Sequence, residues 1–303
     1  MLIDRRIFLS LVAVATAAPA FAIGGAPRGQ IETLPKFAAD NLTEPRIRVW
    51  LPPGYSETER SCRTIYMLDG QYAFADDSDG ANFAADRRIA RLMEVGSIEP
   101  TLIVAIDNLD EDRFLQYMPQ TIYDRANGDV RAIIEREINR VGKTSLVSGQ
   151  FIQFLTNQLK PFVDAHYRTS ADRLDTAIFG ASMAGVMAGA IFVEAQQTFG
   201  RAACMSPNWP IYDERMIDYP KLPSLWSTYF AQLGNPAGRR LWLDHGTEMM
   251  DAGMAPHQSA IAASLADLEW RRGCNLQTRV YDAGHAFAQT ATQMDEVLAW
   301  LLA

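Results

Sequence analysis

Residues 174–185, with the sequence LDTAIFGASMAG, constrain the fold of this chain more than any other stretch. A β-prone run turns through residues 180–182 and continues as a helix of small residues from Met183 to Val193. A buried strand that bends sharply into a helix exposes a serine Oγ at the bend and turns the next backbone N–H toward the same space. We therefore predict that Ser182 is a nucleophile and that the N–H of Met183 binds an oxyanion. A serine that only caps the helix is the alternative interpretation.

The rest of the chain alternates strands with helices, which predicts one α/β domain over residues 23–303 with a mostly parallel sheet covered by helices on both faces. The expected strands are 30–37, 46–51, 64–68, 101–106, 176–179, 202–206, 241–244 and 278–281. The expected helices are 81–95, 150–167, 183–193, 256–272 and a closing helix through residues 294–301, with a kink or break at Pro161. Residues 109–149 and the aromatic-rich segment 209–229 are expected to form loops.

Composition excludes several classes of protein. The 303 residues are 48% hydrophobic, and a net charge of −8 without a Lys/Arg cluster argues against nucleic acid as a partner. The four histidines and three cysteines lack metal-ligand spacing, so we expect no metal and no cofactor. Cys62, Cys204 and Cys274 lie far apart in the sequence, and buried free thiols are the favoured interpretation.

The N-terminus predicts a cleaved export signal over residues 1–22. Arg5 and Arg6 precede an apolar run that is too short to span a bilayer, and small residues before Ala22 suit a cleavage site. Paired arginines followed by Ile-Phe-Leu are typical of the twin-arginine route, with an ordinary secretory signal as the alternative. No later segment is long and apolar enough to span a membrane. We therefore expect a periplasmic or secreted protein.

Polar residues that suit nucleophilic catalysis follow other strands. His285 lies just after the last expected strand, and we predict that it takes the proton from Ser182. His245 also ends a strand and is a rival base, whereas His166 and His257 fall in or beside helices and are expected to be structural. The chain order serine, acid, histidine is the order found in α/β-hydrolases.

The acid is expected in the loop after the strand 241–244. Asp251 and Glu248 are the two main candidates, since either carboxylate could orient the imidazole. Asp244 is a third candidate, but it is still on the strand and its side chain is expected to point into the structure. A carboxylate that only compensates a helix dipole or contacts solvent is the alternative for this loop.

With these residues in place, the chain resembles the esterase D/feruloyl-esterase-like family of α/β-hydrolases, which includes siderophore esterases, carbohydrate acetyl esterases and mycolyltransferases. The motifs that carry the resemblance are VWLPPGY at 49–55, YMLDGQ at 66–71, IDN at 106–108, LKPFV at 159–163, YRT at 167–169, GASM at 180–183, SP at 206–207 and GTE at 246–248. The resemblance implies a serine triad and an oxyanion hole formed by the backbone N–H groups of Gln71 and Met183. It also implies the α/β-hydrolase fold.

Two positions depart from the family pattern. Ala184 stands where glycine is usual, which changes the closest approach of helix and strand. Residues 286–288, Ala-Phe-Ala, replace a polar residue and tryptophan after His285, which predicts a changed pocket wall.

We interpret the chain as an exported serine carboxylesterase acting on a small-molecule or glycan ester of the carbohydrate acyl, feruloyl or siderophore type. An acyltransferase of the same fold is the alternative, because exclusion of water depends on the expected lid residues 109–149 and 207–238. A non-catalytic binding protein on a hydrolase scaffold is the third hypothesis. The acidic run 76–79 reads as a solvated loop, and the aromatics of 209–229 suit either sugar stacking or core packing.

Overall fold

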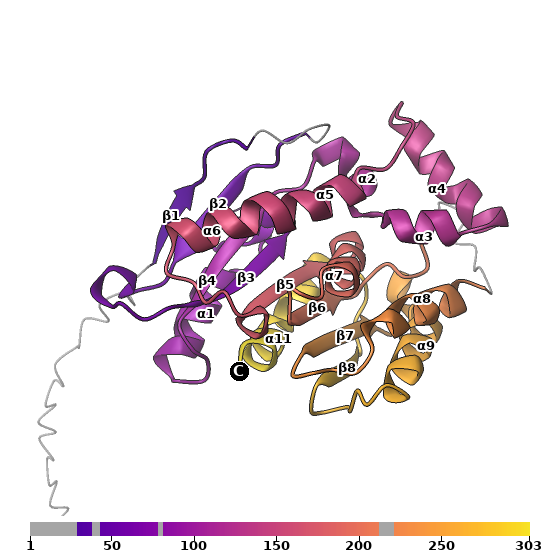
Figure 1. Cartoon of the computed structure of the whole chain (residues 1–303). Helices are drawn as coiled ribbons and strands as arrows, with labels where there is room; N and C mark the ends of the chain where they lie inside the picture. The colour runs from indigo at the N-terminus through magenta and orange to yellow at the C-terminus, as the bar shows by residue number, and fades with distance from the viewer. Residues whose placement is uncertain (1–28, 38–42, 78–80, 212–220) are drawn as a thin grey trace, which may run out of the picture.

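The computed structural model describes residues 29–37, 43–77, 81–211 and 221–303 (Figure 1). The eight strands in these residues form one sheet in the order β1-β2-β4-β3-β5-β6-β7-β8. They are β1 (Gln30–Thr33), β2 (Ile47–Leu51), β3 (Arg63–Leu68), β4 (Thr101–Ile106), β5 (Thr176–Ala181), β6 (Arg201–Met205), β7 (Arg240–Gly246) and β8 (Leu276–Tyr281). Strand β2 is antiparallel to β1 and β4, and the other neighbouring pairs are parallel. This confirms the mostly parallel sheet, whereas the predicted export signal over residues 1–22 lies outside the described residues.

Helices cover both faces of the sheet, as predicted (Figure 1). One core contains the strand residues Tyr66 and Leu68, and the opposite core contains Ile65 and Met67, because side chains alternate along a strand. The helices of the first core are α5 (Ser148–Phe154), α6 (Lys160–His166), α7 (Met183–Glu194), α8 (Leu222–Phe230) and α9 (Ala255–Ala266). The second core is closed by α1 (Ala85–Glu94) and α11 (Met294–Leu302).

Residues 109–149 are largely helical, so the loop predicted for them is wrong. They contain α2 (Arg113–Tyr117), α3 (Gln120–Arg125) and α4 (Gly128–Arg140). Helices α2 and α3 are short, and each of the three buries only a few apolar side chains, such as Leu115, Ile122 and Ile134, which are 0–1% exposed. Tertiary packing decides the conformation of such short amphipathic segments, because their own periodicity is weak.

The chain does not break at Pro161, but the α-helical hydrogen bonding predicted over residues 150–167 is interrupted just before it. The helical path from α5 to α6 passes through a π-helical turn, η5 (Leu155–Leu159), and Pro161 is in the first turn of α6. Proline has no N–H to donate to the fourth residue before it, and its ring crowds that carbonyl group. The turn before Pro161 is therefore widened.

Several element boundaries differ from the sequence prediction, for example the start of α1, which is at Ala85 and not at residue 81. Strand β1 ends at Thr33 and not at residue 37, and β8 begins two residues earlier than expected, at Leu276. Helix α9 ends at Ala266, six residues before the predicted end. A positive φ of 70° at Glu269 is incompatible with a continuing right-handed helix.

The aromatic segment 209–229 contributes to the core. Trp209, Trp226 and Tyr229 are all fully buried, and α8, which contains two of them, replaces part of the predicted loop. The Trp226 Nε1–H donates to the carbonyl oxygen of Trp209 at 2.7 Å, and the two rings lie 4.9 Å apart. Stacking of these three side chains on a sugar is therefore excluded. The aromatic residues Tyr212 and Tyr219 lie outside the described residues.

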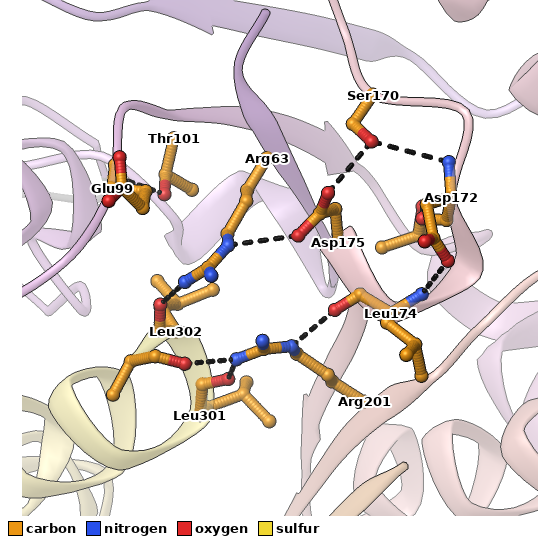
Figure 2. Close-up of polar contacts among 12 residues, drawn as sticks. Arg63, Glu99, Thr101, Ser170, Asp172, Leu174, Asp175, Arg201, Leu301 and Leu302 are labelled. Atoms are coloured by element: carbon orange, nitrogen blue, oxygen red, sulfur yellow. Dashed lines mark hydrogen bonds and ion pairs between the residues drawn. The ribbon is translucent and has the colours of Figure 1, made fainter. Parts of the chain in front are cut away.

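Two arginines at the N-terminal edge of the sheet hold the last turn of α11 (Figure 2). Arg201, at the start of β6, donates through Nη1 to the carbonyl oxygen of Leu301 at 2.6 Å. Arg63, at the start of β3, donates to the carbonyl group of Leu302 and pairs with Asp175 at 3.1 Å. Cations suit the C-terminal end of a helix, where carbonyl groups lack intrahelical partners. These contacts fix α11 at the sheet edge opposite to the end of β5.

All three cysteines are free thiols, and Cys62 and Cys204 are buried as expected, whereas Cys274 is exposed. In the ranges that the structure describes, no helix is long and apolar enough to cross a membrane. Among these same residues, no three His, Cys, Asp or Glu side chains are grouped so that they could hold a metal ion.

Candidate active site

Ser182 lies at a strained bend between β5 and α7. Its backbone angles are φ 58° and ψ −126°, a combination that residues other than glycine rarely adopt. The bend is fixed from both sides, because the Ser182 N–H donates to the carbonyl oxygen of Met205 at 2.9 Å and the Ser182 carbonyl group accepts from the Val186 N–H at 3.1 Å. The serine side chain is thereby held at the C-terminal edge of the sheet.

The closest approach of α7 to the sheet falls at two glycines. A Cβ atom at Gly180 would lie 2.1 Å from the carbonyl oxygen of Ala184, so no other residue fits there without a shift of the helix. A Cβ atom at Gly185 would lie 3.1 Å from the carbonyl oxygen of Met205. Ala184 itself is fully buried in the core. Its methyl group is therefore accommodated. The helix position at which an added Cβ atom would press on the sheet backbone is Gly185, one residue later.

The imidazole of His285 lies between Ser182 and Asp251. Its Nε2 is 2.8 Å from the Ser182 Oγ, and its Nδ1 is 2.6 Å from the Asp251 Oδ1. An ionised carboxylate only accepts hydrogen bonds, so this arrangement assigns the proton of a neutral imidazole to Nδ1. Nε2 is then the acceptor that faces the serine hydroxyl.

The second oxygen of the Asp251 carboxylate is held by two donors. Asp251 Oδ2 accepts from the Ser206 hydroxyl at 2.5 Å and from the Gly246 N–H at 2.9 Å. The side chain is only 1% exposed, and this burial alone would raise the pKa of Asp251. The hydrogen bonds from His285, Ser206 and Gly246 outweigh burial and lower the pKa below its usual value. Asp251 is therefore ionised at neutral pH.

Backbone contacts fix the loop after β7 against the segment that carries His285. The N–H groups of Thr247 and Glu248 both donate to the carbonyl oxygen of Ala283, at 2.9 and 3.0 Å. A Cβ atom at Gly246 would lie 2.0 Å from that same oxygen, so only glycine permits the contact. The Glu248 side chain is exposed, and no hydrogen bond within the described residues joins it to His285. The fold therefore brings Asp251, and not Glu248, to the imidazole.

Asp244 forms a second buried carboxylate behind Asp251. It is fully buried and accepts from the Ser206 N–H at 2.8 Å and from the Trp242 Nε1–H at 2.6 Å. Burial raises the pKa of Asp244 to about 7, although these two donors act in the opposite direction. Its side chain points into the structure, as the sequence suggests. Ser206 thus contacts both carboxylates, one through its N–H and the other through its hydroxyl.

The other three histidines are placed elsewhere. His245 is buried, and its Nδ1 lies 2.7 Å from the carbonyl oxygen of Gly246. His257 is buried in α9, with Nδ1 3.2 Å from the carbonyl oxygen of Gly253. His166 lies at the end of α6, where it stacks on Phe162. Within the described ranges, no hydrogen bond joins any of the three to Ser182.

The turn that contains Gln71 follows β3, the strand next to β5. Met67 pairs with Phe179 across these two parallel strands, so the ends of both strands meet at the same edge of the sheet. Gln71 belongs to the 3₁₀ turn η2 (Gly70–Tyr72). Met183 is the first residue of α7, so its N–H has no acceptor within the helix. The two N–H groups implied by the family resemblance therefore come from neighbouring strand ends.

A bidentate ion pair supports the η2 turn. The Asp69 carboxylate accepts from Arg113 Nε at 2.9 Å and Nη2 at 2.6 Å, and from Asn108 Nδ2 at 2.7 Å. Asp69 has a positive φ of 54°, so the chain turns sharply directly after β3. Sequence reasoning misses this partner, because Arg113 lies in the segment 109–149, for which loops are expected.

Two other sequence features are placed beside this turn. Phe287 begins α10 (Phe287–Thr292) and its ring lies 5.5 Å from that of Tyr72 and 4.6 Å from that of Phe83. In the acidic run 76–79, Asp77 forms a bidentate pair with the buried Arg48, at 2.7 and 3.0 Å. The solvated loop expected there is therefore wrong for Asp77, because a buried guanidinium needs a carboxylate partner. Residues 78–80 lie outside the described residues.

Comparisons with known proteins agree on an esterase family and on the fold. A family model described as "Putative esterase" matches residues 42–301. Similar solved structures include an IroE-like serine hydrolase from Shewanella oneidensis (TM-score 0.63, 17% identity, covering 91% of this chain and 80% of that one). They also include the enterobactin esterase from Shigella flexneri (0.66, 17%, 91% and 59%) and a ferulic acid esterase (0.59, 15%, 91% and 98%). At these identities the structures show the fold alone, and it is the predicted α/β-hydrolase fold.

The raised pKa of Asp244 predicts that this residue makes folding less favourable as pH rises from about 4 to about 7. A free aspartate has a pKa of about 3.9, so between these values the folded state holds a proton that the unfolded state lacks. The free energy of unfolding of the wild type should therefore fall relative to that of Asp244→Asn, by up to about 1.4 kcal/mol per pH unit. Urea denaturation across this pH range measures the difference. Asp267→Asn serves as the control, because Asp267 is exposed. If the difference in unfolding free energy between the wild type and Asp244→Asn does not change with pH, the raised pKa of Asp244 is contradicted.

Proposed function

This chain belongs to the esterase family described as "Putative esterase", and we propose that it is a serine carboxylesterase whose acyl-enzyme forms on Ser182. Family membership makes it an ester hydrolase. The observation that carries the serine mechanism is the position of the His285 imidazole, 2.8 Å from the Ser182 Oγ and 2.6 Å from the Asp251 Oδ1. A nucleophile, a base and a group that orients the base are the three components that acyl transfer to a serine requires.

In the proposed first step, His285 Nε2 takes the hydroxyl proton while the Ser182 Oγ attacks the carbonyl carbon of the ester. The carbonyl oxygen becomes an oxyanion, and the N–H groups of Gln71 and Met183 donate to it. The intermediate then releases the alcohol, which receives the proton from His285, and the acyl group stays on Ser182. A water molecule, deprotonated by His285, then attacks the acyl carbon. The bond to the Ser182 Oγ breaks, His285 returns the proton to that oxygen, and the carboxylic acid leaves.

Asp251 is proposed to keep the imidazole in the productive tautomer. Its Oδ1 accepts the Nδ1–H of His285, and its charge stabilises the imidazolium that forms in each step. The Ser206 hydroxyl and the Gly246 N–H hold Oδ2 and keep the carboxylate ionised, so it presents a fixed negative charge to the ring. Glu248 would then have no part in the reaction.

We propose a carbohydrate acyl, feruloyl or siderophore ester as the substrate class, and export as the location. The support for the substrate is the similarity in fold to an enterobactin esterase and a ferulic acid esterase. The support for export is the Arg5-Arg6 pair followed by a short apolar run. A hydrolysis screen of the purified protein against these three ester types tests the substrate. Loss of periplasmic protein in an Arg5→Lys, Arg6→Lys double variant tests the export route.

Ser182→Ala should lower kcat for p-nitrophenyl acetate by about 10⁴–10⁶, because no other group can carry the acyl intermediate. A fluorophosphonate probe should label the wild type and fail to label Ser182→Ala. Ser264→Ala is the matched control, since Ser264 lies on α9 and its hydroxyl donates to the backbone carbonyl groups of Ser227 and Ile261. Retention of a tenth of the wild-type kcat by Ser182→Ala would contradict the proposal. Absence of labelling in the wild type would favour a non-catalytic scaffold.

Asp251→Asn should lower kcat by roughly 10²–10⁴, since an amide at this position can donate to Nδ1 and so hold the wrong tautomer of His285. Glu248→Gln should lower kcat by less than about tenfold, because the Glu248 side chain is exposed. Steady-state hydrolysis of the same ester by both variants makes the comparison. A larger loss for Glu248→Gln would show that Asp251 is not the acid.

A further inference from the structure

Arg48 lies in β2, is 8% exposed, and contacts the turn that carries the proposed oxyanion donor. Its Nη2 donates to the carbonyl oxygen of Gly70 at 2.7 Å. That carbonyl group belongs to the same peptide unit as the N–H of Gln71. We propose that Arg48 is a positioning residue that orients the Gly70–Gln71 peptide so that its N–H faces the oxyanion. This inference rests on the proposed function, because it assigns a role within that mechanism.

The geometry of the peptide bond connects the two ends of this unit. A trans peptide is planar, and its carbonyl oxygen and its N–H point in opposite directions. A donor that fixes the oxygen of Gly70 therefore fixes the direction of the Gln71 N–H. The donor here is a charged guanidinium, which forms a stronger hydrogen bond than a neutral group does. A hydrogen bond to the carbonyl group also polarises the peptide and makes its N–H a better donor.

The guanidinium of Arg48 is itself fixed. It makes a bidentate pair with Asp77, at 2.7 and 3.0 Å, and it lies 4.8 Å from the centre of the Phe74 ring. Asp77 also accepts from the Phe74 N–H at 2.9 Å, and a second carboxylate, Asp107, lies 3.6 Å from Arg48 Nη2. The planar fork of arginine lets one side chain donate to a carboxylate and to a peptide carbonyl at once.

Other contacts also act on this turn, and the Gly70 carbonyl oxygen accepts a second hydrogen bond, from the Ala73 N–H at 3.0 Å. A Cβ atom at Gly70 would lie 2.4 Å from the backbone nitrogen of Ile106, so the turn is pressed against β4. Asp69 is held by Arg113 and Asn108. Rotation of the peptide between two such fixed positions is a movement that glycine tolerates easily, since it has access to positive φ. The neutral hydrogen bond from Ala73 and the charged one from Arg48 together oppose that rotation, and the charged one is the stronger.

The test is Arg48→Lys, which keeps a charge near Asp77 but loses the fork. With p-nitrophenyl acetate we expect kcat to fall by about 10–100-fold, less than the 10²–10³-fold loss typical of deleting an oxyanion donor, and KM to stay within about threefold. The affinity for a trifluoromethyl ketone, which forms an oxyanion on the serine, should fall by the same factor as kcat/KM. A residue with only a structural role would not produce this match.

Arg201→Lys is the matched control. Arg201 is also 8% exposed and donates to backbone carbonyl groups, but it lies at the opposite edge of the sheet. We expect this variant to lose stability and to keep kcat within about twofold. Asp77→Asn removes the carboxylate that fixes the Arg48 guanidinium, so it should lower kcat and ketone affinity by a smaller factor than Arg48→Lys does. It provides a second measurement if Arg48→Lys unfolds at the assay temperature.

Wild-type kcat in a folded Arg48→Lys variant, or a loss confined to KM, would overturn the role of Arg48 while leaving the proposed function intact. If Arg48→Lys does not fold, wild-type affinity of Asp77→Asn for the ketone, together with wild-type kcat, would overturn it as well. A wild type that neither hydrolyses esters nor reacts at Ser182 would instead overturn the proposed function, and this assignment with it.

Discussion

The strained turn at Ser182 is the constraint on which the candidate site depends. A residue other than glycine at φ 58° and ψ −126° costs about 1–3 kcal/mol, and the surrounding structure must hold it in place. Helix α7 does so, because every residue from Met183 to Val193 is buried between the sheet and the helices of the first core. The tight contacts at Gly180 and Gly185 then set how far the serine stands from the sheet. The packing of α7 against the sheet thus determines the position of the Ser182 hydroxyl group.

Two buried carboxylates near the strand ends, both hydrogen-bonded to Ser206, have pKa values shifted in opposite directions. Asp251 accepts three hydrogen bonds and its pKa is lowered, whereas the more deeply buried Asp244 accepts two and its pKa is raised. Ser206 gives its hydroxyl to the first and its N–H to the second. In the proposed mechanism, this arrangement presents one fixed negative charge to His285. A second charge beside it would be costly, because like charges in a buried site oppose ionisation.

The sequence predicted the parts of the site that depend on local pattern. A strand, a serine and a small-residue helix indicated the bend at Ser182, and chain order pointed to His285. It left Asp251 and Glu248 open, because the choice depends on backbone contacts to Ala283 that bring distant loops together. Arg48 gave no signal, since a charged residue in an alternating strand reads as solvent-exposed. Helices α2, α3 and α4 were missed for a related reason, because packing stabilises them more than periodicity does.

The central claim is that an acyl group is transferred to Ser182. Mass spectrometry of the protein quenched in acid after brief mixing with p-nitrophenyl acetate tests it most directly. We predict one acetyl group per chain, mapped to the peptide that contains Ser182, and its disappearance as deacylation proceeds. An acetyl group on any other residue, or hydrolysis of the ester with no adduct at Ser182 at the shortest times, would contradict the account.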